Sequence, residues 1–138
     1  MIKILKLSDR IKLKIDKVIF YLAPLSNLQK MEVSSCTKIK GGEDVFDYGT
    51  AQHLYIKHSL KRIEGIESYH GEKYELEFDG ESLSDDCVTE IFNLSQKDEL
   101  MNAAWQILNG MPNEITNLDN KNYKRAALEI LKALPVKE

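Results

Sequence analysis

The first part of the chain alternates apolar and charged residues with the period of a β-strand. Residues 11–15 place an isoleucine or a leucine at every second position, which is typical of a strand with one buried face. After a short turn, residues 18–22 form a second run that is rich in β-branched and aromatic side chains. Pro24 ends this run, because proline cannot donate a hydrogen bond to a β-ladder. We therefore expect an antiparallel hairpin over these two runs.

Two helices are expected next, and each is marked at its start by a capping residue. Ser26 and Gln29 have the spacing of a capping box, in which each side chain satisfies a backbone N–H of the first turn. They predict a helix over residues 27–39, which the following pair of glycines is expected to end. Asp47 can cap a second helix, over residues 48–63, which carries an apolar stripe on one side.

The second half of the chain predicts one more hairpin and three more helices. Residues 66–69 and 74–78 are expected to pair as strands across a turn at Gly71, with strict alternation in the second strand. The three helices are expected to begin after Ser84, to run from Ser95 or Asp98 to about Asn109, and to run from about Asn122 to Leu134. Strands grouped in hairpins indicate an antiparallel sheet, so the expected fold class is α+β with about five helices.

Length and composition fit a single domain over residues 1–138. The chain has a hydrophobic fraction of 43% and a charged fraction of 30%, which are typical of a globular protein. Residues 1–9 are expected to be either a flexible lead or an extra strand. The apolar runs are far shorter than the ~20 residues of a membrane span. The first residues also lack the apolar stretch of a signal peptide, so we expect a cytoplasmic protein without a membrane partner.

The net charge of −3 argues against a nucleic-acid partner, because nucleic-acid-binding domains are usually basic. The charge is uneven along the chain, with a basic N-terminal stretch and an acidic stretch over residues 64–90. This polarity either steers a charged partner or reflects only solvated surfaces.

The polar residues do not form a recognised catalytic, cofactor or metal motif. His53 and His58 are five residues apart, whereas two zinc ligands on one helix are usually three or four apart. Residues 79–86 are rich in acids but lack the order of a calcium-binding loop. Cys36 and Cys87 have no nearby second cysteine, and we expect both to be small core residues, with a disulfide or a reactive thiol as the alternatives. We therefore expect no enzyme activity, cofactor or metal, and only a spatial pairing of histidine and cysteine would change this view.

The remaining candidates for function are apolar helix faces. Trp105 and Leu108 share a stripe of the helix before Asn109, and Leu131 and Leu134 end the stripe of the last expected helix. At helical spacing such stripes form either the core or a helix-in-groove contact with another protein. These four residues are the candidate partner-binding residues.

Residues 11–33 resemble the start of phage tail assembly chaperones. The second strand ends in Phe20-Tyr21-Leu22-Ala23-Pro24-Leu25-Ser26 and runs into a helix that begins Asn27-Leu28-Gln29-Lys30. Residues 60–94, with the run Tyr74-Glu75-Leu76-Glu77-Phe78-Asp79-Gly80, are also similar to small phage tail proteins. The likeness covers about half the chain.

The resemblance implies a non-enzymatic protein of the infected cell, without catalytic residues. Such chaperones keep the long tape measure protein soluble, recruit tail tube subunits to it and are absent from the finished virion. Two other kinds of protein-binding module stay open on the residues alone, namely a virion structural protein and an inhibitor of a host defence protein.

Overall fold

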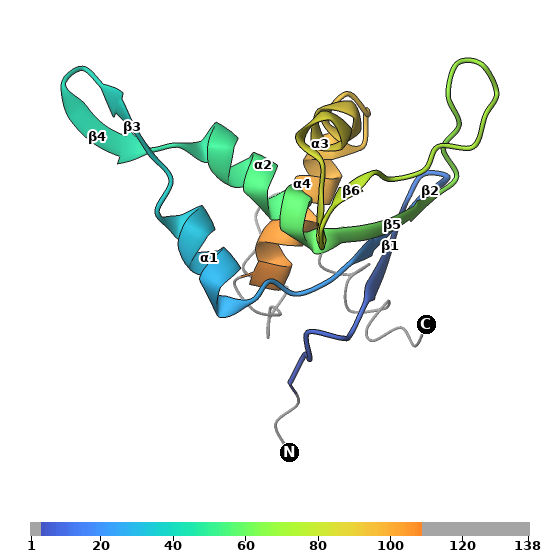
Figure 1. Ribbon diagram of the computed structural model, residues 1–138, viewed down its shortest axis with the longest axis horizontal. Helices are drawn as coiled ribbons and strands as arrows, with labels where there is room; N and C mark the ends of the chain where they lie inside the picture. The colour runs from blue at the N-terminus through green and yellow to red at the C-terminus, as the bar shows by residue number, and fades with distance from the viewer. Residues whose placement is uncertain (1–3, 109–138) are drawn as a thin grey trace.

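The computed structural model describes residues 4–108 of the chain, and this part combines helices with antiparallel strands as expected for an α+β fold (Figure 1). The elements, in chain order, are β1 Ile11–Ile15, β2 Val18–Leu22, α1 Asn27–Ser34, β3 Thr37–Lys40, β4 Glu43–Phe46, α2 Tyr48–Ser59, β5 Leu60–Glu64, β6 Phe78–Asp79, β7 Ser82–Leu83, α3 Asp85–Phe92 and α4 Lys97–Leu108. The described part has four helices instead of about five. The helix expected near residues 122–134 lies outside the described residues.

A three-stranded antiparallel sheet with the order β1-β2-β5 forms the centre of the fold. The predicted hairpin is confirmed, with Leu13 opposite Phe20 and a tight turn at Asp16, whose φ is 55°. On its other side β2 pairs with β5, and Phe20 lies opposite Ile63. Because β2 has a neighbour on both sides, its backbone is satisfied in the middle of the sheet.

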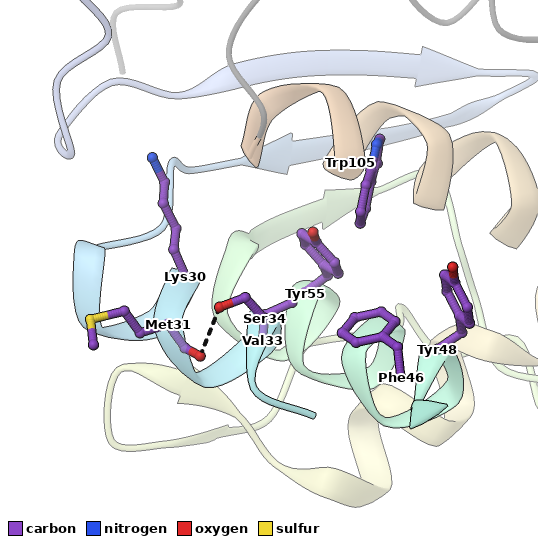
Figure 2. Close-up of a pocket in the computed structure, with 8 residues that line it drawn as sticks. All are labelled: Lys30, Met31, Val33, Ser34, Phe46, Tyr48, Tyr55 and Trp105. Carbon is purple, nitrogen blue, oxygen red and sulfur yellow. Dashed lines mark hydrogen bonds between the residues drawn. The ribbon is translucent and has the colours of Figure 1, made fainter. Parts of the chain in front are cut away.

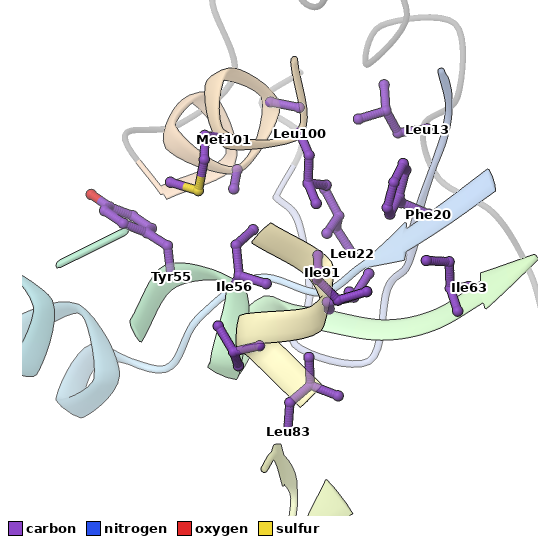
Figure 3. Packing of buried hydrophobic residues seen from close by; sticks show 14 of the residues in the cluster. Leu13, Phe20, Leu22, Tyr55, Ile56, Ile63, Leu83, Ile91, Leu100 and Met101 are labelled. Atoms are coloured by element: carbon purple, nitrogen blue, oxygen red, sulfur yellow. The ribbon is translucent and has the colours of Figure 1, made fainter. Parts of the chain in front are cut away.

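The core lies between one face of this sheet and helices α2, α3 and α4. Side chains from all four elements converge there (Figure 3). The largest fully buried ones are Phe20, Ile11, Leu13, Leu22, Ile56, Leu60, Leu83, Ile91 and Leu100. Burial of each such side chain stabilises the folded state by about 1.5–3 kcal/mol relative to leaving it exposed, so this cluster is the main source of stability.

Helix α1 begins as predicted but ends five residues earlier. The capping box is present, because the Gln29 N–H donates to Ser26 Oγ over 3.2 Å and the Ser26 N–H donates to Gln29 Oε1 over 2.9 Å. The predicted helix end at residue 39 is wrong, since β3 and β4 form a hairpin around Gly41-Gly42. Both glycines have positive φ, 62° and 81°, which is the conformation of a hairpin turn. The glycine pair is therefore a hairpin signal and not a helix stop.

The β3–β4 hairpin projects from the body of the protein, and the loop of residues 66–77 projects at the opposite end (Figure 1). All four residues of β3 are exposed, including Ile39 at 76%. At the base of the hairpin, the Asp47 N–H donates to the Cys36 carbonyl over 3.0 Å, and Phe46 packs against the core. We refer to residues 37–46 as the arm.

The predicted continuation of α2 to residue 63 is also wrong. Helix α2 ends at Ser59, and residues 60–64 leave it directly as strand β5. Leu60 and Ile63 are buried against the sheet, and the Ala23 N–H donates to the Ser59 carbonyl over 2.8 Å. Pairing with β2 overrides the local helical pattern, because tertiary context outweighs weak helix propensity.

The second predicted hairpin forms only in part. Glu67 and Lys73 make a single antiparallel bridge beside the turn at Gly71. Of the expected strand over residues 74–78, only Phe78 is in a strand, where it pairs with Leu83. Phe78 is 46% exposed and does not face the core as the alternation predicted.

The two helices of the second half are placed as predicted. The Cys87 N–H donates to Ser84 Oγ over 3.2 Å, so Ser84 is the cap of α3. Residues 4–9 form no strand, and residues 1–3 lie outside the described part. Within residues 4–108, the helices are all too short or too polar to cross a bilayer.

Gly65, directly after β5, allows a close approach between this segment and the β1–β2 turn, and this approach can be tested. Its φ is 87°, and a Cβ there would overlap the carbonyl oxygen of Lys17 in the β1–β2 turn. We expect Gly65→Ala to lower the free energy of unfolding by roughly 2–5 kcal/mol, as left-handed strain adds to this overlap. Urea denaturation followed by circular dichroism measures the change.

Gly71→Ala is the matched control for this substitution. Gly71 has a φ of 81°, and a Cβ there would meet no atom within 4 Å. Only the strain remains, so the loss should be about 1–2 kcal/mol. Equal losses for the two variants would show that the approach of Lys17 is unimportant.

Candidate functional site: an aromatic groove

An apolar hollow of about 510 Å³ lies between α1, α2 and the end of the arm, beside α4 (Figure 2). The residues that line it are Lys30, Met31, Val33, Ser34, Phe46, Tyr48, Tyr55 and Trp105. An adjoining hollow of about 320 Å³ shares its four aromatic side chains and continues along Ala51, Gln52, Met101 and Asn102. We refer to the two together as the aromatic groove.

The four aromatic side chains of the groove pack as two pairs. The rings of Tyr55 and Trp105 are 5.4 Å apart with an interplanar angle of 58°, and they face each other across α2 and α4 in Figure 2. The rings of Phe46 and Tyr48 are 4.8 Å apart and meet edge to face at 88°. Tilted and edge-to-face pairs are the favourable aromatic geometries, so each pair holds its members in place.

Exposure divides the groove into a floor and a rim. Tyr55 forms the floor and is only 5% exposed, whereas Trp105, Met31 and Tyr48 are 43%, 57% and 66% exposed. Burial raises the pKa of the Tyr55 hydroxyl to about 12. Among the described residues that line the groove, Lys30 carries the only charge. The groove is therefore a surface for apolar groups with one cation at its edge.

Of the four candidate partner-binding residues, the structure places Trp105 in the groove. Leu100 and Met101 on the same helix are buried, so the stripe of α4 is core up to Trp105, which lies at its margin. The side chain of Leu108 is outside those described, and Leu131 and Leu134 lie outside the described residues.

The contributions of Phe46, Tyr48 and Met31 to the groove are not predicted by the sequence pattern. Tyr48 and Tyr55 are seven residues apart in α2, which places them on one face of a helix, and this spacing was the available signal. Phe46 lies at the groove because the arm ends there, and Met31 lies there because α1 packs on α2. Local patterns do not report such packing.

The titratable side chains outside the groove connect α2 to its neighbours. His53 Nε2 lies 2.8 Å from Asp85 Oδ1, and Lys57 Nζ lies 2.9 Å from the same oxygen. The hydrogen bonds from Lys57 and then from His53 lower the pKa of Asp85, which is the first residue of α3. These contacts join two helices on the surface.

His58 connects α2 to two further elements. Its Nδ1 lies 2.7 Å from Ser82 Oγ on β7, and its Nε2 lies 3.2 Å from Glu32 Oε2 on α1. His53 and His58 thus have separate partners. Within residues 4–108, no three His, Cys, Asp or Glu side chains are grouped as a metal site would require.

The two cysteines differ in their surroundings. Cys87 is fully buried, as expected, and its sulfur lies 3.3 Å from the Tyr74 hydroxyl. Burial is the main cause that raises the pKa of Tyr74. Cys36 is half-buried at the base of the arm, where burial and then the charges of Asp47 and Glu32 raise the pKa of its thiol. The Cys36 thiol is therefore held protonated and is a weak nucleophile at neutral pH.

Comparisons with protein-family models, curated proteins and solved structures find no match to this chain. The resemblance to tail assembly chaperones therefore stays a hypothesis.

The pKa of Tyr55 predicts a specific loss of stability at high pH. An unfolded tyrosine ionises near pH 10, whereas folded Tyr55 ionises near 12. The contribution of the neutral Tyr55 hydroxyl to the free energy of unfolding is fully present below the pKa of the unfolded chain, near 10. It is lost as the pH rises through the pKa of the folded protein, near 12. We expect Tyr55→Phe to make the fall in unfolding free energy above about pH 10 shallower. Urea midpoints between neutral and strongly alkaline pH measure this slope.

Tyr69→Phe is the control, because Tyr69 is fully exposed. This variant should keep the alkaline slope of the parent protein. An unchanged slope in Tyr55→Phe would contradict the buried, neutral hydroxyl at the floor of the groove.

Proposed function

We propose that this chain is a non-enzymatic protein-binding domain whose aromatic groove holds an apolar segment of another protein. The observation that carries the proposal is the exposed rim of Trp105, Tyr48 and Met31 above the buried Tyr55. Tryptophan, tyrosine and methionine are enriched in protein interfaces, and tryptophan and tyrosine are enriched among the few residues that carry most of the binding energy.

The groove favours an amphipathic helix as the occupant. All of its lining side chains except Phe46 come from α1, α2 and α4, whose backbone groups bond within their own helices. An extended strand would need unpaired backbone partners along the groove, which helical walls do not offer. A helix needs only apolar side chains at one face, and an acidic residue at its edge would complement Lys30.

The specific form of the proposal is a phage tail assembly chaperone. Its partner would be the tape measure protein, which is long and helical, and the complex would recruit tail tube subunits in the host cytoplasm. Support comes from the strand, corner and capped helix of residues 11–33, which fold in the order that the resemblance implies. Nucleic acid and membrane are not partners in this proposal.

Co-expression with the tape measure protein encoded nearby tests this function. We expect a soluble complex that co-purifies, together with higher solubility of the tape measure protein. Failure of the two proteins to co-purify would contradict the chaperone. Detection of this chain in purified particles would instead identify a virion structural protein.

Substitutions in the rim test the groove itself. We expect Tyr48→Ala and Trp105→Ala each to weaken partner binding roughly 10-fold or more, because truncating an aromatic hot spot costs about 2 kcal/mol or more. Ile39→Ala is the matched control, since Ile39 is an exposed apolar residue of the arm outside the groove. Circular dichroism confirms that each variant is folded. Equal binding by all three variants would place the interface elsewhere.

A further inference from the structure

A second hollow, of about 460 Å³, lies apart from the aromatic groove and shares no lining residue with it. It is enclosed by the segment before β1, the link from β2 to α1, the end of α2 with the start of β5, and the β6–β7 turn. Two cations, Arg10 and Lys61, line it from different elements. We refer to it as the basic hollow.

Arg10 and Lys61 are oriented by backbone carbonyls that do not neutralise them. Arg10 donates from one terminal nitrogen to the carbonyls of Leu7 and Asp9, each over 3.0 Å. Lys61 Nζ donates to the carbonyl of Glu81 over 2.8 Å. Both side chains are half-buried, and within residues 4–108 neither forms an ion pair. The guanidinium has five N–H groups and the ammonium has three, so donors remain on both.

The two cations also repel each other. Burial lowers the pKa of Lys61, the charge of Arg10 lowers it further, and the Glu81 carboxylate partly opposes both effects. An anion between the two cations would relieve this repulsion.

Of the other polar side chains that line the basic hollow, the Glu81 carboxylate opposes an anion, and three neutral ones have hydrogen-bond partners. His58 bonds to Ser82 and Glu32, and Ser26 and Gln29 satisfy each other in the capping box of α1. Attraction of an anion in this hollow therefore depends on the two cations, which outnumber the single carboxylate, and not on the helix start.

We propose that the basic hollow binds a phosphate group between Arg10 and Lys61, either as free phosphate or as the phosphate of a small monoester. The planar fork of an arginine matches two phosphate oxygens, and a lysine ammonium adds a point charge on another side. The volume of the hollow exceeds that of a single anion and lies within the range of small-molecule sites, so it also has room for the organic part of an ester.

Titration of the full-length protein with inorganic phosphate tests this site, with amide chemical shifts measured by NMR at constant ionic strength set by chloride. We expect saturable shifts at Arg10, Lys61 and their neighbours. Arg10→Gln and Lys61→Gln should each weaken binding at least tenfold. Glu81→Gln should strengthen it, because the opposing carboxylate is removed. Lys12→Gln changes an exposed lysine of β1 outside the hollow and should bind like the parent protein.

Non-saturable shifts, shifts that chloride reproduces, or equal weakening by Lys12→Gln would overturn the proposal, because they indicate charge screening alone. Should Arg10→Gln fail to fold, Arg10→Lys keeps the charge without the fork and should bind more weakly than the parent protein. Binding by Arg10→Lys that is as tight as in the parent protein would contradict the role of the fork. A parallel titration with glycerol 3-phosphate distinguishes the sources: tighter binding identifies a phosphate ester, and equal or weaker binding identifies free phosphate.

Discussion

The two-sided pairing of β2 is the constraint on which the rest of the structure depends. Hydrogen bonds to β1 on one side and β5 on the other place Phe20 in the centre of the sheet, opposite both Leu13 and Ile63. The pairing with β5 fixes where α2 must end, because the chain has to leave the helix at Ser59 to reach the sheet. The direction of α2 in turn sets the position of Tyr55. The floor of the aromatic groove is thus positioned by a strand on the other side of the core.

The elements that could be predicted from the sequence are those specified by neighbouring residues. The alternation of residues 11–15, the capping box of Ser26 and the cap at Ser84 each involve contacts a few residues apart, and all three were found. Strand β5 depends instead on a partner some forty residues earlier, and its residues fit a helical stripe equally well. The Gly41-Gly42 turn was ambiguous because glycine both ends helices and forms tight hairpins.

The candidate site, like the fold, contains one part that local sequence predicts and other parts that depend on tertiary packing. Trp105 could be selected from the sequence, because a large aromatic residue in an amphipathic stripe is a candidate for either core or contact. The groove around it could not, since its walls come from α1, α2 and α4 and its end comes from the arm. The basic hollow was equally hidden, because Arg10 and Lys61 are separated by fifty residues and meet only where the sheet, α1 and the β6–β7 turn approach one another. Sites made by tertiary packing leave no local pattern.

The arm has a consequence for what a segment bound in the groove would contact. A two-stranded hairpin without a sheet or core beneath it is marginally stable in water. The four residues of β3 and the first two residues of β4 are exposed, so this outer part of the arm has no core beneath it. Phe46 belongs both to the last position of β4 and to the lining of the groove. A segment bound in the groove would therefore pack on a side chain of the arm as well as on the helices, and it would add apolar support at the base of the arm.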